Sequence, residues 1–597
     1  KVEGGSVTAD DGSAVNAGWT QVTAGDPVIP AGDSRVFKKT FKVGGMSPEQ
    51  MTWDQGVTVC RGGYNGGAAC TVDSQCPTST CGLAGHQYVY RIGQDHNDNT
   101  KWLMDEGDAS PNTGGNILKN GIYEGDTFNG NDYYDSTWSN MKALFGVKCS
   151  VAGDDCVRTG SGTGTVYVRF GDGLTPNNRA ITFAPYYKGA IQAYNSKNLV
   201  IQNSLVRNAS AGILIDNLSD YATIQNNTVS GCGDGISISA RTSQNANWPN
   251  NATVKNNTVT MNSATNMSPS NVHHWFIWNA IRHESISIDG SAGIRHCIAA
   301  DDAGDNLLID SNIVSDCFEG IAIYSDYNNT TTHLRNAVVR NNTISHTTNE
   351  ALALYQAQNL KAYWNRLSDF NNGVRLGAVY VGLGPVYLYQ NTFYNPTIPT
   401  NQAGSTGFGF HRSTTAIVNV YHNSFSGVRR SFYYGGTPSN AGSGVCTTDP
   451  GFCLPNVHVY NNILSSITTS PKVEDAGWNT IADAEKATVD NNWFAPAPTT
   501  VSFQTDGVDN NFTGSGVMWT ADVDPYPFYP NGGGWIDIGK NLLLDPTNYP
   551  LQGSWTAPLD AGGVQAGATA TPTATPSPTV TPTVTGATIT PTPTVTA

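Results

Sequence analysis

The sequence predicts an all-β chain built mainly as a solenoid of stacked parallel strands, and two patterns support that prediction. A short motif containing Asn between apolar positions recurs at intervals of 23 to 39 residues, with a single interval of 55. Each motif is followed by a segment in which apolar residues alternate with small or polar ones, such as GILI from Gly212, GISIS from Gly235 and ALALY from Ala351. A period in this range indicates a solenoid, and alternation with period two indicates strands.

The repeated motif predicts a ladder of stacked Asn side chains. It occurs as VIQNSL, IQNNTV, VKNNTV, IDSNIV, VRNNTI, AYWNRL, LYQNTF, VYHNSF and VYNNIL. Stacked Asn amides can hydrogen-bond along the axis, and Asn tolerates the left-handed backbone of a sharp turn. The interval of 55 predicts two turns, one of which has lost its Asn. The expected ladder consists of Asn203, Asn227, Asn257, Asn312, Asn342, Asn365, Asn391, Asn423 and Asn462.

With these motifs, the region from about Thr165 to Ser470 resembles the right-handed parallel β-helix proteins of the pectate-lyase-like superfamily, as found among secreted bacterial surface proteins. The resemblance implies a right-handed parallel β-helix. The segment GTVYVRFGDGLTPNNRAITF resembles the first coil of such domains, and GKNLLLDPTNYPLQGSWTAPLDAGG resembles a closing segment. It does not assign an activity, because one fold hosts many functions.

We expect four regions along the chain. Because an open solenoid exposes strand edges, its ends need covering. The final stretch has no charged residue and alternates Thr with Pro, which favours an extended, O-glycosylated stalk. The predicted boundaries are an N-terminal cap at 1–164 with a Cys-rich insertion at about 56–82, a β-helix at 165–470, a C-terminal cap at 471–565 and the stalk at 566–597.

Composition limits the partners. Only 13% of the residues are charged, against about 25% in typical soluble proteins, so Asn, Ser, Thr and Gly must supply the polar surface. The net charge of −15 argues against nucleic acid and anionic membranes as main partners. No apolar run is long enough to predict a transmembrane segment. The chain starts at Lys1 without an apolar leader, which we interpret as a mature N-terminus.

The 11 Cys residues predict disulfides and therefore an oxidising, extracellular or cell-surface location. Zinc is the alternative for the first four, but they lack a CxxC pair. Cys297 and Cys317 lie about one repeat apart and could bridge, which leaves Cys232 as the odd thiol. The expected disulfide residues are Cys60, Cys70, Cys76, Cys81, Cys149, Cys156, Cys297, Cys317, Cys446 and Cys453.

Two loop-like segments contain candidate functional residues. In HHWFIWNAIRHESISIDG, Trp275 and Trp278 could stack on a sugar while Arg282 and His283 serve catalysis. The alternative, favoured on sequence alone, is a loop that packs its Trp residues on the solenoid. In AADDAGDNLLID, the carboxylates of Asp301, Asp302 and Asp305 are suitable Ca²⁺ ligands, although Asp is also ordinary in such turns.

A third candidate is a row of carboxylates. Asp234 and Glu319 each follow their ladder Asn by seven residues, and Glu350 follows by eight. Glu319 and Glu350 on neighbouring turns could lie within the separation of about 5–9.5 Å that glycoside hydrolysis uses. The alternative is a set of solvated turn residues. A basic set that includes Arg375 could serve a uronate lyase, but the repeats contain few Lys residues.

Two functions remain open on the sequence. The first is an extracellular structural or adhesive surface protein, such as a filament or coat subunit, which contacts glycans or neighbouring copies of itself and carries O-glycans on its tail. The alternative is a secreted polysaccharide lyase or glycoside hydrolase. The stalk, low charge and disulfides favour the first slightly, and the fold expected from the resemblance favours the second.

Overall fold

The computed structural model describes strands and connections over much of the chain. The described residues are 1–26, 33–54, 58–60, 81–83, 87–94, 101–104, 122–123, 141–150, 156–157, 160–169, 175–177, 179, 181–185, 189–239, 248–260, 296–301, 303–317, 319–324, 334–355, 358–376, 385–394, 406–410, 417–426, 428, 430–434, 457–460, 462–465, 472–475, 488–490, 493–495, 512–513, 519–521 and 528–530.

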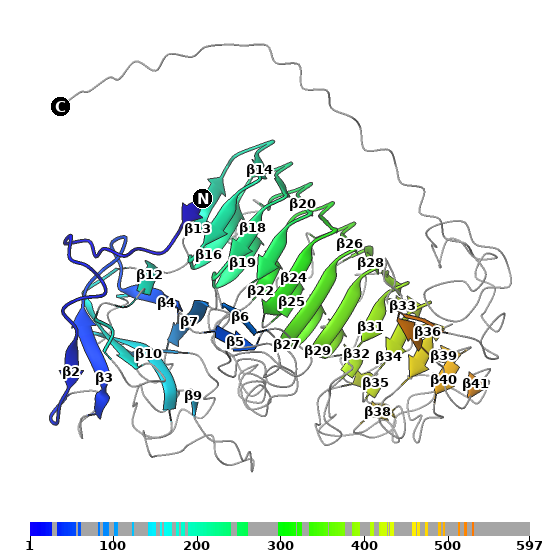
Figure 1. Ribbon diagram of the computed structural model, residues 1–597. Coiled ribbons are helices and arrows are strands. Elements are labelled where there is room, and N and C mark those ends of the chain that lie inside the picture. The colour runs from blue at the N-terminus through cyan, green and yellow to red at the C-terminus, as the bar shows by residue number, and fades with distance from the viewer. Residues whose placement is uncertain are drawn as a thin grey trace, which may run out of the picture.

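The dominant feature is a right-handed parallel β-helix, as the sequence predicts (Figure 1). One rung is formed by β14 (Val200–Gln202), β15 (Leu205–Arg207) and β16 (Ala211–Asp216). These strands pair in parallel with β17 (Thr223–Gln225), β18 (Thr228–Ser230) and β19 (Asp234–Ser239) of the next rung. Each rung therefore lies directly above its predecessor, in register.

The rungs form two long sheets. The ten-stranded sheet contains β14, β17, β20 (Thr253–Lys255), β23 (Leu308–Asp310), β26 (Val338–Arg340), β28 (Leu360–Tyr363), β30 (Val386–Tyr389), β33 (Val418–Tyr421), β36 (Val457–Tyr460) and β39 (Thr488–Asp490). The 20-stranded sheet contains two alternating rows, and β27 (Thr343–Leu354) and β29 (Arg366–Leu376) run through both.

The remaining strands of the 20-stranded sheet are β1 (Val2–Glu3), β13 (Gly189–Tyr194), β15, β16, β18, β19, β21 (Thr258–Thr260), β22 (His296–Asp301), β24 (Ile313–Cys317), β25 (Glu319–Tyr324), β31 (Thr392–Tyr394), β32 (Thr406–Phe410), β34 (Ser424–Ser426), β35 (Arg430–Tyr434), β37 (Ile463–Ser465), β38 (Lys472–Asp475), β40 (Trp493–Ala495) and β41 (Phe512–Thr513). Their inward side chains form one continuous hydrophobic core, which extends from Ala193 to Val459.

Buried Asn side chains form a ladder along this core. The Oδ1 atom of Asn342 accepts hydrogen bonds from the backbone N and the Nδ2 of Asn312, at 2.9 and 3.0 Å. Its Nδ2 donates to Asn365 at 2.9 Å and to the Ile309 carbonyl at 3.1 Å. The same contacts repeat from Asn227 to Asn462, so each rung is tied to the next by side-chain amides.

The expected ladder position of Asn203 is wrong by one residue. The backbone N of Ser204 donates to Asn227 Oδ1 at 3.0 Å, so Ser204 occupies the ladder position of its rung. Asn203 instead has a φ of 55°, as does Asn226 immediately before the ladder residue Asn227. The turn therefore divides two roles between adjacent residues, because the left-handed residue precedes the ladder residue.

The expectation of two turns in the 55-residue interval is also wrong. Asn257 Nδ2 donates directly to Asn312 Oδ1 at 3.0 Å. β20 pairs with β23, β21 with β24 and β19 with β22. The interval is therefore a single rung, and its additional residues lie between β21 and β22.

An antiparallel sheet precedes the solenoid in the chain. It contains β2 (Thr20–Val22), β3 (Asp33–Thr40), β4 (Pro48–Asp54), β7 (Gln87–Gln94), β8 (Lys101–Met104), β9 (Ile122–Tyr123), β10 (Met141–Cys149), β11 (Gly164–Arg169) and β12 (Ile181–Pro185). β11 and β12 occupy the segment that resembles a first coil, and β13, which follows them, stacks on β16. Apart from β1, the parallel stack therefore starts at β13 rather than at Thr165.

Both ends of the parallel stack differ from the expected boundaries. β1 at the start of the chain pairs in parallel with β15, so the N-terminal segment contributes to the solenoid. At the other end, β38 to β41 continue the parallel pairing beyond the expected end at Ser470. Two antiparallel pairs complete the described strands: β5 (Thr58–Cys60) with β6 (Cys81–Leu83), and β42 (Trp519–Ala521) with β43 (Phe528–Pro530).

The predicted stalk at 566–597 lies outside the described residues. In the part of the chain that the structure describes, no helix has the length and apolar character needed to cross a membrane.

The ladder predicts a strong positional contrast between adjacent Asn residues. We expect Asn342→Ala to lower the unfolding free energy by about 2–4 kcal/mol, because it leaves buried amide and backbone groups without partners. Asn341 is the matched control, since it is exposed and has a φ of 55°, which Gly adopts readily. Chemical denaturation followed by circular dichroism measures the difference. Equal losses for Asn342→Ala and Asn341→Gly would contradict the role of the ladder.

Candidate functional site

The candidate site starts from a local irregularity at the first residues of β19, β22 and β25 and near Glu350 within β27. A Cβ on Gly235 would lie 2.4 Å from Val259 Cγ1, so this position points into the core and has no room for a side chain. The next residue, Ile236, is also in the core. Two successive inward residues turn the preceding one, Asp234, to the outside of the helix.

The same arrangement in successive rungs produces a row on the outer face, the polar row, which consists of Asp234, His296, Glu319 and Glu350. His296 is directly paired with Glu319 in the β22–β25 register. Ile236 is paired with Ile298, and Asp234 and His296 each lie two residues before their member of this pair. Ile321 is paired with Leu352, and Glu319 and Glu350 lie two residues before theirs.

Beside the polar row, small residues allow two tyrosines to lie against the sheet. Ala322 and Ala353 are buried and pack with Tyr355 and Tyr324. The Tyr324 and Tyr355 rings stack with centroids 4.8 Å apart, and the His296 ring lies 5.5 Å from Tyr324. The Tyr324 hydroxyl donates a hydrogen bond to Glu319 Oε2. The tyrosine side chain therefore extends from the last residue of β25 back to the polar row at its first residue.

Charged groups connect the polar row across rungs. His296 lies between two carboxylates, with Nδ1 3.4 Å from Asp234 Oδ1 and Nε2 3.0 Å from Glu319 Oε2. Arg375, on β29, donates from Nη1 to Glu350 Oε1 at 2.6 Å. Three carboxyl groups thus face two cations in a nearly solvent-free environment.

The Glu319 and Glu350 carboxyl groups lie on neighbouring rungs, and each shifts the pKa of the other. Glu350 is fully buried, and its Oε2 has no hydrogen-bond donor as a partner. Two ionised carboxylates have no proton to share and repel each other. A proton on Glu350 removes this repulsion and balances the charge of the cluster.

The surroundings push the pKa values of this pair apart. Burial raises the pKa of Glu350, and the charge of Glu319 raises it further against the opposing effect of Arg375. Burial also acts to raise the pKa of Glu319, but the charge and hydrogen bond of His296 outweigh it and hold that pKa well below its ordinary value. Burial lowers the pKa of His296, whereas Glu319 and Asp234 raise it to about 9. At neutral pH the site therefore contains a carboxylate, a carboxylic acid and an imidazolium.

The structure brings Glu319 and Glu350 together, as the row predicted from the sequence requires. The alternative of solvated turn residues is wrong because both side chains are buried. Sequence reasoning missed His296, because its rung has a long insertion and its distance from the ladder Asn differs. Pairing HCIAAD with EGIAIY as equivalent strands would have found it.

Four other predicted site residues lie outside the described residues: Trp275, Trp278, Arg282 and His283. Of the predicted Ca²⁺ ligands, Asp301 ends β22 and Asp302 lies outside the described residues. The Asp305 carboxylate forms a forked ion pair with Arg335, whose Nη2 lies 2.6 Å from Oδ2. Among the described residues, no three His, Cys, Asp or Glu side chains are grouped to hold a metal ion, and the Ca²⁺ site stays a prediction.

Two of the expected disulfides lie within the described residues. Cys149 bonds to Cys156, and Cys297 bonds to Cys317, while Cys232 is a buried free thiol. Cys60 and Cys81 are paired in the β5–β6 register, whereas Cys70, Cys76, Cys446 and Cys453 lie outside the described residues. The Cys297–Cys317 disulfide joins the residue after His296 to the residue two before Glu319, so it covalently ties the two rungs that carry this contact.

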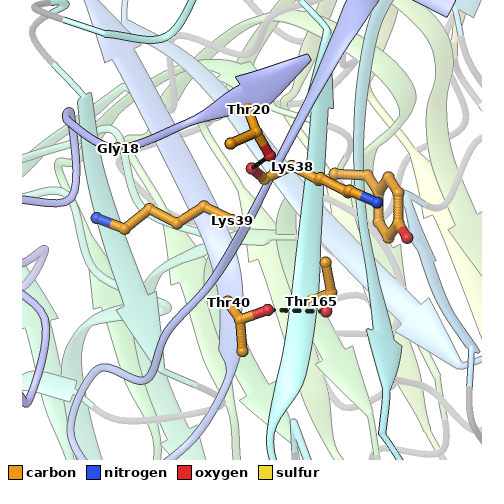
Figure 2. A pocket seen from close by; sticks show the side chains of 7 residues that line it. Gly18, Thr20, Lys38, Lys39, Thr40 and Thr165 are labelled. Carbon is orange, nitrogen blue, oxygen red and sulfur yellow. Dashed lines mark hydrogen bonds between the residues drawn. The ribbon is translucent and has the colours of Figure 1, made fainter. Parts of the chain in front are cut away.

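A cavity of about 470 Å³ lies on the N-terminal sheet, away from the polar row (Figure 2). Its lining comprises Gly18, Thr20, Lys38, Lys39, Thr40, Thr165 and Tyr167. Lys38 forms an ion pair with Asp26, and Lys39 donates to the Ala14 carbonyl at 2.6 Å. Both cations are therefore already engaged, which makes this cavity a weaker candidate than the polar row.

Comparison with known proteins identifies the fold. The family model described as the right-handed β-helix region matches residues 122–274 and 284–464, more than half of the chain. No curated protein matches the chain in sequence.

Three solved structures illustrate the similarity. XylC in complex with xylose is 10% identical with a TM-score of 0.37, and the match covers 86% of this chain and 74% of XylC. The catalytic unit of a GH87 α-1,3-glucanase from Streptomyces thermodiastaticus is 10% identical with a TM-score of 0.31, over 83% and 91% of the two chains. The tailspike of E. coli bacteriophage HK620 in complex with a pentasaccharide is 12% identical with a TM-score of 0.25, over 55% and 52%. Similarity at this level says nothing about the activity of this chain.

The raised pKa values of Glu350 and His296 predict a stability that declines as pH rises above 4.5. The pKa of Glu350 rises from 4.5 to about 8, so its contribution is complete below pH 4.5 and is lost towards pH 8. The raised pKa of His296 adds a loss between pH 6.5 and about 9. We expect Glu350→Gln to flatten the decline between pH 4.5 and 8 in denaturation experiments, where a tenfold change in proton affinity corresponds to about 1.4 kcal/mol. Parallel pH curves for the variant and wild type would contradict the raised pKa.

The disulfide beside the polar row predicts a position-dependent loss of stability. We expect Cys297→Ala/Cys317→Ala to lower the unfolding free energy by about 3 kcal/mol. The disulfide closes a loop between residues 20 positions apart, and its removal raises the conformational entropy of the unfolded chain. Cys149→Ala/Cys156→Ala is the matched control, and its separation of 7 residues predicts a smaller loss, about 2 kcal/mol. A larger loss in the control would contradict this ranking.

Proposed function

The chain belongs to the right-handed β-helix family, and from that premise we propose that it hydrolyses a glycosidic bond in an extracellular glycan, with Glu319 and Glu350 as the acid–base pair. The observation that carries the proposal is the placement of these two buried carboxyl groups at equivalent positions of neighbouring rungs, with opposed pKa shifts. The fold by itself does not favour one activity over another.

The opposed pKa values assign a role to each carboxyl group. Glycoside hydrolysis needs one carboxylic acid to protonate the leaving oxygen and one carboxylate to stabilise or attack the sugar. Glu350, with its raised pKa, retains its proton at neutral pH and is the general acid. Glu319, with its lowered pKa, is the carboxylate. Proton transfer by a positioned acid typically contributes a factor of about 10²–10⁴ to the rate.

Glycosidases hold their two carboxyl groups roughly 5 Å or more apart, with the sugar between them. In the proposal, the glycosidic oxygen accepts the Glu350 proton. Arg375 remains bonded to Glu350 Oε1 and keeps the acid oriented. Glu319 then faces the positive charge that develops on the sugar ring.

The neighbouring side chains and the composition support a glycan as substrate. Tyr324 and Tyr355 provide an aromatic surface with polar ends beside the acid–base pair, and such surfaces suit sugar rings. The low charge of the chain and its disulfides support an extracellular or cell-surface location. The glycan is therefore the proposed partner.

A second candidate is a structural or adhesive surface protein, such as a filament or coat subunit. The observation that favours it is the burial of the whole polar row, since Asp234, His296, Glu319 and Glu350 are each at most 9% exposed. The long stack of rungs and the Thr/Pro-rich tail, a proposed O-glycan carrier, also suit an assembly role. Neighbouring copies would then be the partners.

The carboxyl pair gives the first test. We expect Glu319→Gln and Glu350→Gln each to reduce depolymerisation of the cleaved glycan by at least 10²-fold, because each removes one proton-transfer or charge-stabilising group. The assay is release of reducing ends from a panel of neutral and acidic polysaccharides.

Glu49→Gln is the matched control, because Glu49 is a buried carboxyl that accepts a hydrogen bond from Ser210 at 2.6 Å on the N-terminal sheet. It should leave the cleavage rate within a few-fold of wild type. Cleavage that survives both Glu319→Gln and Glu350→Gln would move the active site elsewhere. Absence of cleavage across the panel, together with regular filaments in electron micrographs, would favour the structural candidate.

A further inference from the structure

We propose that His296 and Asp234 are positioning residues that determine which of the two neighbouring carboxyl groups carries the proton, by holding Glu319 as the carboxylate. The inference rests on the proposed function of the Glu319–Glu350 pair. It assigns a role to two residues that do not themselves belong to that pair.

The first step is the geometry of the imidazole. His296 has Nδ1 at 3.4 Å from Asp234 Oδ1 and Nε2 at 3.0 Å from Glu319 Oε2. A neutral imidazole has one N–H donor, whereas an imidazolium has two. A histidine that lies within ion-pair distance of two carboxylates is therefore held in the charged form.

The second step is the order of the charged residues along the successive rungs. Asp234, His296 and Glu319 lie on β19, β22 and β25, which are three successive rungs. Glu350 and Arg375 lie on the following two, β27 and β29. The charged groups around Glu319 are therefore His296 and Asp234 on one side and Glu350 and Arg375 on the other.

The hydroxyl of Tyr324 donates to the same Oε2 atom of Glu319 that faces His296. The Oε2 atom of Glu319 is therefore contacted by two donor side chains, His296 and Tyr324. The disulfide between Cys297 and Cys317 adds a covalent tie between the strands that carry His296 and Glu319. The contact is built into the rung geometry and does not depend on flexible surface side chains.

The third step is what happens without the imidazolium. Burial raises the pKa of both Glu319 and Glu350, so burial by itself does not separate the two. Arg375 contacts Glu350 and favours its ionised form. Without His296, the nearest cation would favour the opposite assignment, with the proton on Glu319. His296 is therefore the residue that makes Glu350 the acid.

The inference is tested first without any activity assay. Selective ¹⁵N labelling of the 11 His residues allows the protonation of each imidazole to be followed by NMR. We expect one resonance to remain imidazolium at pH 8, and to be absent in His296→Gln. Its titration midpoint should fall by at least one pH unit in Asp234→Asn and stay unchanged in the control Asp216→Asn. Asp216 is a buried carboxyl on the same face, and it accepts a hydrogen bond from the Asn217 backbone.

The second readout is the pH profile of glycan cleavage. Cleavage needs Glu319 ionised, so removal of the imidazolium should move the acidic limb upward by at least one pH unit in His296→Gln. Asp234→Asn should move the same limb by less, with kcat falling more than KM changes. A uniform loss at every pH, without movement of the limb, would overturn the positioning role.

The two proposals fail in different ways. A neutral His296 at pH 8, or a titration midpoint that Asp234→Asn leaves unchanged, overturns the positioning role even if Glu319→Gln and Glu350→Gln still abolish cleavage. If no glycan is cleaved at all, the proposed function fails, while the NMR midpoints still decide whether Asp234 holds His296 charged.

Discussion

The parallel register of the rungs is the constraint on which the rest of this structure depends. Neighbouring parallel strands lie about 4.8 Å apart, so residues at equivalent positions of successive rungs are brought into contact whatever their distance in sequence. Asp234 and His296 meet although a long insertion separates their strands. A one-residue slip in any rung would turn its alternating side chains to the opposite face. The buried Asn ladder opposes such a slip, because each amide has its partners in one register only.

The packing of successive rungs also explains why the side chains of the polar row point out of the solenoid. Gly235 and Gly320 occupy inward positions where a Cβ would approach core atoms to about 2.5 Å, and the rung in between has Cys297, whose side chain enters the core disulfide. These residues allow two successive inward positions at the start of each strand. The residue before them is then turned outward, and at Glu319 the hydroxyl of Tyr324 reaches it from the other end of β25.

The fold could be predicted from the sequence because its signal repeats. The Asn motif and the alternating strands predicted the solenoid and the approximate position of Glu319 and Glu350. Two details could not be obtained in that way. Asn203 resembles a ladder residue, but the ladder and the left-handed turn are adjacent positions that single Asn residues do not distinguish. The 55-residue interval resembled two rungs, because sequence spacing does not separate an additional rung from an insertion within one.

The candidate site was predictable only in part, for a related reason. The carboxylates of Glu319 and Glu350 were found by counting from their ladder Asn residues, and this count fails for His296 because of the insertion in its rung. Arg375 was noticed as a basic residue, but its partner was not, since the pairing of β27 with β29 is shifted between Thr347 and Glu350. Irregularities in register are set by packing between rungs, which is not visible in the sequence of one rung.

The cost of burying charge supports a role for the polar row beyond holding the fold. Removing ion pairs from water carries a penalty that well-packed neutral residues avoid. In this solenoid, the equivalent position carries Ala211 in the preceding rung and Asn372 and Thr406 in the following ones, so neutral residues satisfy the same backbone geometry. Charged or ionisable residues occupy it in four consecutive rungs from Asp234 to Glu350, and again at Arg430 and Lys472 farther along the stack. Because the rung does not require them there, their concentration at one place, with two cations and three carboxyl groups, is better explained by chemistry performed at that place than by stability.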